Sequence, residues 1–164
     1  MNTIKWFGSV TAALFLAVAC GSAGSTSSAS NSPQHSSDAA MHHATLDVQS
    51  SRFGEILVDG QGRALYLFAA DKTSASTCYG ACATAWPPLL TEKGATIDAM
   101  HMATASLTGT TTRNDGTVQV TYNGHPLYYF QGDTKPGQVT CQAVVNFGAA
   151  WYVVDPHGNA ITTS

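Results

Sequence analysis

The sequence predicts an all-β fold, a small domain made of two tandem, pseudo-equivalent β-hairpin repeats that pack against each other. The first observation is internal repetition, because the pattern of residues 56–71 returns without a gap at residues 118–133. The second is that both copies alternate apolar and polar residues, cross a glycine turn and alternate again. Such duplication indicates a supersecondary unit that cannot bury its apolar face alone.

The turns and the strand faces support this reading. Asn123-Gly124 separates two alternating runs and predicts a tight hairpin, because both residues tolerate positive φ. Residues 59–62 form the looser equivalent in the first copy. On the return strand Leu65 and Leu67 point one way and Tyr66 points the other. Both faces are apolar, so we expect the hairpins to pack against one another.

Each copy also has a tail. Residues 86–90 contain two prolines and predict an edge strand or the start of a loop. Residues 151–161 predict a strand, an Asp-Pro-x-Gly turn and a closing strand. Between the copies, a short helical turn is expected from Thr77 to Ala85.

The chain begins with an export signal. Lys5 precedes an apolar stretch, residues 10–19, that is too short for a stable membrane span. Small residues then lead to Cys20, so residues 1–19 resemble a lipoprotein signal peptide and Cys20 the acylated residue. The alternative is an ordinary secretory peptide, which leaves Cys20 as a free thiol. Both interpretations predict an exported protein, and the first a lipid anchor in a membrane of the bacterial cell envelope.

The rest divides into a tether and a domain. Residues 20–45 are mostly Ser, Ala and Gly and predict a flexible tether, because they cannot bury enough surface to offset ordering entropy. Residues 46–164 form the repeat domain, with repeat one at about 53–92 and repeat two at about 116–162. The net charge is −3 and no basic cluster is present, which argues against a nucleic-acid partner.

Four motifs in order resemble those of a known family. Residues 66–71 and 128–133 are similar to the Yx(FWY)xxD motif of bacterial secreted-repeat lipoproteins. The Cys78–Cys82 segment with residues 86–89, and residues 151–158, look like that family's other signatures. The motif residues are Tyr66, Phe68, Asp71, Trp86, Tyr128, Phe130, Asp133 and Trp151. The resemblance, which spans about 53–161, implies an envelope lipoprotein without an assigned biochemical role; Cys141 departs from the family pattern.

The motif residues allow two interpretations. In the functional one, the aromatic side chains form a ledge for a flat or sugar-like ligand, with Asp71 and Asp133 at its rim. In the structural one, the aromatic residues are core and each aspartate caps the turn after its strand by accepting backbone N–H bonds. A motif duplicated at symmetric positions is more typical of architecture, so the structural interpretation is favoured.

The domain cysteines predict one disulfide. Cys78 and Cys82 are close in sequence in an exported chain, and on a helical turn their Cα atoms come within disulfide range. Redox catalysts prefer a two-residue spacer, and neither a haem-attachment motif nor a second zinc-ligand pair is present. Cys141 is left over. It is buried or free, displaces one partner of the pair, or links two molecules, and we favour buried or free.

Two Met/His clusters offer a rival function. They consist of Met41, His42 and His43 at the tether edge and Met100, His101 and Met102 between the repeats. Thioether and imidazole together suit copper, especially the reduced ion, so the alternative is a copper-binding or electron-transfer protein. The plainer interpretation is Met and His scattered through polar loops.

No nucleophile–base constellation or revealing carboxylate pair stands out, so we expect neither an enzyme nor a cofactor. The sequence therefore favours a membrane-tethered, non-catalytic binding or structural module. Its expected partners are the membrane, through Cys20, and an envelope protein or cell-wall component.

Overall fold

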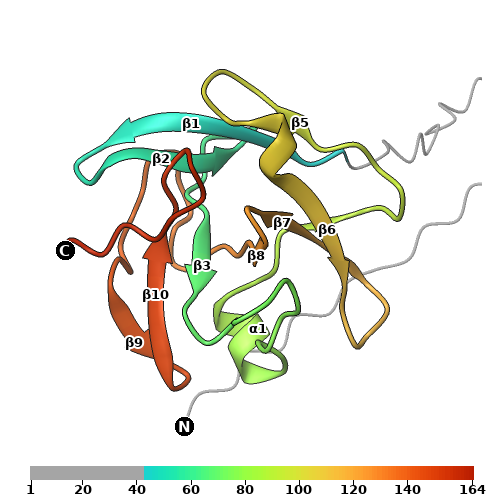
Figure 1. The fold of residues 1–164 in the computed structure, drawn as a ribbon. Coiled ribbons are helices and arrows are strands. Elements are labelled where there is room, and N and C mark those ends of the chain that lie inside the picture. The colour runs from blue at the N-terminus through green and yellow to red at the C-terminus, as the bar shows by residue number, and fades with distance from the viewer. Residues whose placement is uncertain (1–42) are drawn as a thin grey trace, which may run out of the picture. The chain divides into compact units, whose positions relative to one another are not determined.

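A computed structural model describes residues 43–164 (Figure 1). Its strands are β1 (Thr45–Ser51), β2 (Gly54–Asp59), β3 (Tyr66–Phe68), β4 (Leu90–Thr91), β5 (Asp98–Ala99), β6 (Thr108–Thr112), β7 (Val118–Tyr122), β8 (His125–Pro126), β9 (Val144–Asn146) and β10 (Ala149–Val153). The helical elements are α1 (Ala81–Ala85) and the short 3-10 helix η1 (Ala105–Leu107). The all-β class is confirmed. So is the helical turn, which begins at Ala81 because Gly80 has a φ of 56° that no right-handed helix contains.

The strands form three small sheets. The first has the order β2-β1-β5, the second β3-β10-β9, and the third β4-β7-β6 with β8 on β7. In the second sheet, β3 of repeat one pairs with β10 of repeat two, and in the third β4 of repeat one pairs with β7 of repeat two. The repeats therefore exchange strands, so that each completes a sheet of the other.

The two hairpin turns differ by one residue. Asn123 and Gly124 have φ values of 48° and 78°, which confirms the predicted two-residue turn. In repeat one the Asp59 N–H donates to the Arg63 carbonyl oxygen, so three residues lie between them. The Asp59 Oδ1 accepts the N–H groups of Gln61 and Arg63, which stabilises the wider turn. The hairpins are thus not equivalent residue for residue, although the sequence aligns without a gap.

The return strands divide their side chains between two cores, as the two-faced apolar pattern predicts. One core contains Leu57, Leu65, Leu67, Val120, Tyr122 and Leu127 among its buried residues. The other contains Ile56, Val58, Tyr66, Phe68, Trp86, Tyr128 and Trp151. Successive strand residues point to opposite faces, so one short strand stabilises both cores.

Some predictions fall on residues 1–42. The signal peptide, the lipidated Cys20, most of the tether, Met41 and His42 lie outside the described residues. Within the described residues, β1 begins at Thr45, the last residue of the predicted tether. Within residues 43–164, no helix has the length and apolar character needed to span a membrane.

Candidate functional site

The Yx(FWY)xxD tyrosines and aspartates join the two repeats reciprocally. The Tyr66 hydroxyl donates to Asp133 Oδ2 at 2.5 Å, and the Tyr128 hydroxyl donates to Asp71 Oδ2 at 2.6 Å. The Tyr66 and Tyr128 backbones also exchange N–H···O bonds of 2.8 and 2.9 Å. Each tyrosine therefore binds the aspartate of the other repeat, and the motif acts as a two-way clasp.

The second oxygen of each aspartate holds a loop. Asp71 Oδ1 accepts the backbone N–H and the hydroxyl of Thr77, and Asp133 Oδ1 accepts the same two groups of Thr140. Asp71 and Asp133 are 3% and 1% exposed. These contacts match the structural interpretation of the motif, in which the aspartates cap backbone after the strand.

Aromatic rings fill the space between the repeats in the order Phe68, Trp151, Trp86, Phe130. The two indoles stack with centroids 4.0 Å apart, and Phe68 stacks on Trp151 at 4.1 Å. Phe130 meets Trp86 at 4.8 Å. Each phenylalanine thus packs on the tryptophan of the other repeat. The two tryptophans and Phe68 are buried, so these rings form a core and not a surface ledge.

The tyrosines of the clasp resist ionisation. Burial, followed by the bond to Asp133, raises the pKa of Tyr66 well above its usual value. Burial and the bond to Asp71 do the same to the pKa of Tyr128. Both phenols are therefore donors at every physiological pH, as the clasp requires.

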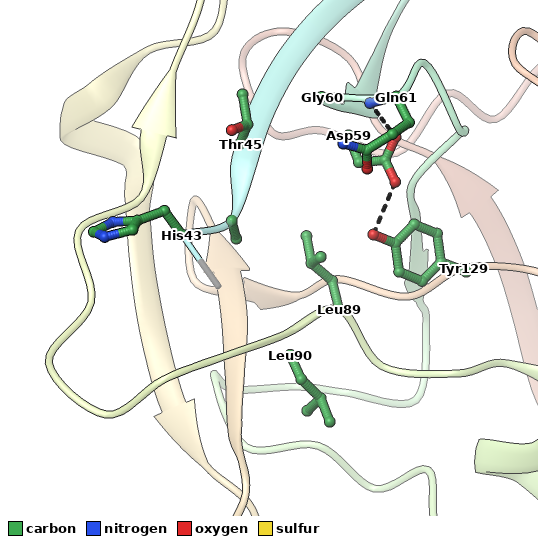
Figure 2. Close-up of a pocket in the computed structure, with 9 residues that line it drawn as sticks. His43, Thr45, Asp59, Gly60, Gln61, Leu89, Leu90 and Tyr129 are labelled. Carbon is green, nitrogen blue, oxygen red and sulfur yellow. Dashed lines mark hydrogen bonds between the residues drawn. The ribbon is translucent and has the colours of Figure 1, made fainter. Parts of the chain in front are cut away.

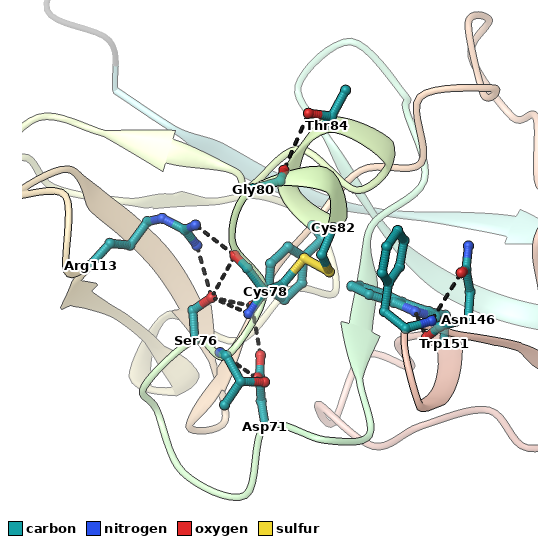
Figure 3. The surroundings of a disulfide bond; sticks show 12 residues. Asp71, Ser76, Cys78, Gly80, Cys82, Thr84, Arg113, Asn146 and Trp151 are labelled. Carbon is teal, nitrogen blue, oxygen red and sulfur yellow. Dashed lines mark hydrogen bonds between the residues drawn. A yellow bond between two sulfur atoms is a disulfide. The ribbon is translucent and has the colours of Figure 1, made fainter.

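Figure 3 shows the disulfide and the arginine beside it. Cys78 and Cys82 are bonded with Cα atoms 5.3 Å apart, which confirms the predicted disulfide. Arg113 Nη2 donates to the Cys78 carbonyl oxygen at 2.8 Å, and Nη1 donates to Ser76 and Gln119. Arg113 is only 4% exposed. Sequence reasoning missed it, because an arginine in a polar turn normally points to solvent.

Cys141 is free and partly buried. Thr140-Cys141 follows Asp133 as Thr77-Cys78 follows Asp71, so Cys141 occupies the place of Cys78 in repeat two. Four residues further on stands Val145 instead of a second cysteine. Burial, with Asp133 nearby, raises the pKa of the Cys141 thiol, which lowers its reactivity.

A small pocket lies where the repeats meet (Figure 2). We call it the seam pocket; it has a volume of about 140 Å³ and is lined by His43, Ala44, Thr45, Asp59, Gly60, Gln61, Leu89, Leu90 and Tyr129. The Tyr129 hydroxyl donates to Asp59 Oδ2 at 3.0 Å, and the Arg63 guanidinium stacks on the Tyr129 ring. Burial, then Asp59, raises the pKa of Tyr129.

Sequence reasoning did not single out the seam pocket. Asp59 was assigned only to a turn, and Tyr129 entered only as part of the motif at residues 128–133. Their meeting depends on how the hairpins pack, although one signal exists: Tyr129 stands where repeat one has Leu67. Repeat one folds with a leucine at this position, so the hydroxyl of Tyr129 is not required by the fold that the two repeats share.

The described Met and His residues fall into separate places. His43 is exposed and lines the seam pocket, whereas His101 and Met102 line another groove, beside β1 and β2. The structure thus brings His101 and Met102 together but does not place His43 with them. Within residues 43–164, no three His, Cys, Asp or Glu side chains gather as ligands of one metal ion.

Comparison with known proteins adds one match. Residues 48–90 and 109–155 both match the family model described as a secreted repeat of unknown function. The two matches together cover more than half of the chain and correspond to the two structural repeats. No curated protein and no solved structure shows significant similarity to the chain.

Proposed function

This chain belongs to the family of secreted repeats of unknown function, and on that premise we propose a non-catalytic, membrane-tethered module of the cell envelope. The repeat domain binds another envelope component, and the tether holds it away from the membrane. Family membership supports export, which is the first requirement of such a role.

The observation that carries the proposal is the reciprocal Tyr–Asp clasp. A catalytic carboxylate needs an oxygen within reach of substrate. In this chain both oxygens of Asp71 and of Asp133 are buried and accept bonds from Tyr or Thr. The motif that defines the repeat is therefore occupied in joining the halves. This supports a scaffold that presents its surface to a partner.

The proposed anchor is Cys20. We expect Cys20→Ser to move the protein from the membrane fraction to the soluble fraction, because a serine cannot carry the thioether-linked lipid. Fractionation of cells that express each form measures this. Cys141→Ser is the matched control and should leave the protein in the membrane fraction. Membrane association unchanged in Cys20→Ser would remove lipidation from the proposal.

The seam pocket is the proposed contact point for the partner. Leu90 lines it and is 43% exposed, so its apolar side chain is available for a partner to cover. We expect Leu90→Arg to abolish retention of envelope material by the immobilised protein, because a charge placed in the pocket opposes burial. Val145→Arg is the control, since Val145 is 74% exposed on β9 and does not line the pocket.

Pull-down from the native envelope, followed by mass spectrometry, compares the three forms. If a component captured by the parent is lost with Leu90→Arg and kept with Val145→Arg, the result supports the seam pocket as the contact point. Loss with Val145→Arg alone would move the contact to β9 and contradict it. Equal capture by all three forms would also contradict it.

A further inference from the structure

The loop after β5 presents two kinds of soft metal ligand on one groove. His101 and Met102 line this groove together with Asp47 of β1 and Glu55 of β2. The loop is fixed to the sheet, because the Met100 N–H donates to the Leu46 carbonyl oxygen at 2.8 Å. The Ala103 N–H then closes the turn onto the Met100 carbonyl oxygen at 2.9 Å. These two backbone hydrogen bonds fix the conformation of the loop that carries the ligands.

Asp47 orients the imidazole. The His101 Nδ1 lies 2.7 Å from Asp47 Oδ1, while the histidine side chain is 68% exposed. A carboxylate only accepts hydrogen bonds, so in neutral His101 it holds the proton on Nδ1 and leaves the Nε2 lone pair free. A ring nitrogen bonded to a carboxylate is the usual second contact of a metal-binding histidine.

The thioethers determine which metal fits. Met100 and Met102 are 47% and 54% exposed, so both side chains are accessible to an ion in solution. Imidazole with thioether is a soft donor set that suits Cu(I), whereas a structural zinc site needs four Cys, His or carboxylate ligands. Asp47 and Glu55 add negative charge, and among residues 43–164 no Lys or Arg lines the groove. The electrostatics therefore favour a cation.

We propose that this groove is a Cu(I) site. The ion is bound by His101 Nε2 and Met102 Sδ, and Met100 supplies a second thioether as the third ligand. Asp47 is a positioning residue, which fixes the histidine tautomer and does not bind the ion. This site shares no residue with the seam pocket or the lipid anchor, so a failure of the proposed function would not contradict it.

The test measures Cu(I) affinity against a competing chelator without oxygen. The mature chain carries Cys20→Ser and Cys141→Ser, because free thiols would bind Cu(I) themselves. We expect His101→Ala and Met102→Leu each to weaken binding about tenfold or more. A control with Met41→Leu, His42→Ala and His43→Ala should bind as tightly as the parent. Weaker binding in the control alone, or equal binding in all variants, would overturn the site.

The role of Asp47 has its own readout. Asp47→Ala should weaken Cu(I) binding about 10- to 100-fold, the usual cost of losing such a contact. Asp47→Asn keeps an acceptor oxygen and should restore most of the affinity. Nitrogen NMR of His101 should show the metal on Nε2 in the parent. In Asp47→Ala it should show a mixture of molecules with the metal on Nε2 and molecules with the metal on Nδ1. Affinity and nitrogen assignment unchanged in Asp47→Ala would contradict the positioning role.

Discussion

At the scale of single residues, buried phenols bonded to carboxylates hold the halves of the domain together. Tyr66, Tyr128 and Tyr129 each donate to an aspartate of the other repeat. The sequence showed tyrosines and aspartates at repeated spacing, but it did not show that each bond crosses between repeats. Spacing fixes which residues share a strand face. It does not determine which distant carboxylate that face will meet.

These phenols predict a loss of stability at alkaline pH. Burial raises the pKa of all three tyrosines above the unfolded value of about 10. Their contribution is complete below about pH 10 and is lost as pH rises toward the folded pKa, because the unfolded state then releases protons that the folded state keeps. The free energy of unfolding should fall by up to about 1.4 kcal/mol per pH unit for each tyrosine.

Tyr129→Phe tests this dependence. It removes one of the three phenols, so the alkaline slope should become shallower by up to about 1.4 kcal/mol per pH unit. Denaturant unfolding at several pH values between about pH 8 and about pH 11 measures the slope in both proteins. Identical slopes would show that Tyr129 ionises in the folded state as easily as in the unfolded chain.

At the scale of elements, the hairpin turns separate what local sequence determines from what packing determines. Asn123-Gly124 gave the correct turn because both residues adopt the positive φ that a two-residue hairpin turn requires. The wider turn at Asp59 depends on a side chain that accepts two backbone N–H groups. The helix α1 was expected four residues too early, because Thr77 bonds to Asp71 and the chain turns at Gly80 instead.

A contact between two turns gives the element-scale prediction. Gly158 has a φ of +84°, and a Cβ there would lie 2.3 Å from Asn123 Cβ. Gly158→Ala should therefore combine left-handed strain of about 1–2 kcal/mol with overpacking of about 1–3 kcal/mol. Gly148→Ala is the matched control, because Gly148 has a φ of +89° and nothing within 4 Å. It should show the strain alone.

Thermal or denaturant unfolding of both variants measures the difference. Asn123 Nδ2 also donates to the His157 carbonyl oxygen at 3.2 Å, so the turns are bonded as well as packed. Equal destabilisation by the two alanines would mean that the turns separate at no cost.

At the scale of the whole molecule, duplication has produced one interlocked domain instead of two small ones. The repeat and its two-faced strands predicted packed halves, and this was correct. The exchange of β3 and β4 between the halves was not predictable, because pairing partners of short strands are chosen by long-range packing. The seam pocket and the Asp47–His101 contact are products of the same packing. They join residues from different elements, so neither has a local signature in the sequence.

This interlocking predicts that neither repeat folds alone. A fragment of residues 43–104 lacks the strand that pairs with β3, and a fragment of residues 105–164 lacks β4 and Trp86. Each would expose a tryptophan and leave its motif tyrosine and aspartate without their partners in the other repeat. We expect no cooperative unfolding transition in either fragment and recovery of the native transition in an equimolar mixture, measured by near-ultraviolet circular dichroism.

Trp151→Ala in the second fragment should weaken reassociation more than about a hundredfold, because losing a stacked, buried indole costs about 3–5 kcal/mol. A cooperative transition in one fragment alone would show that a single repeat suffices for a fold.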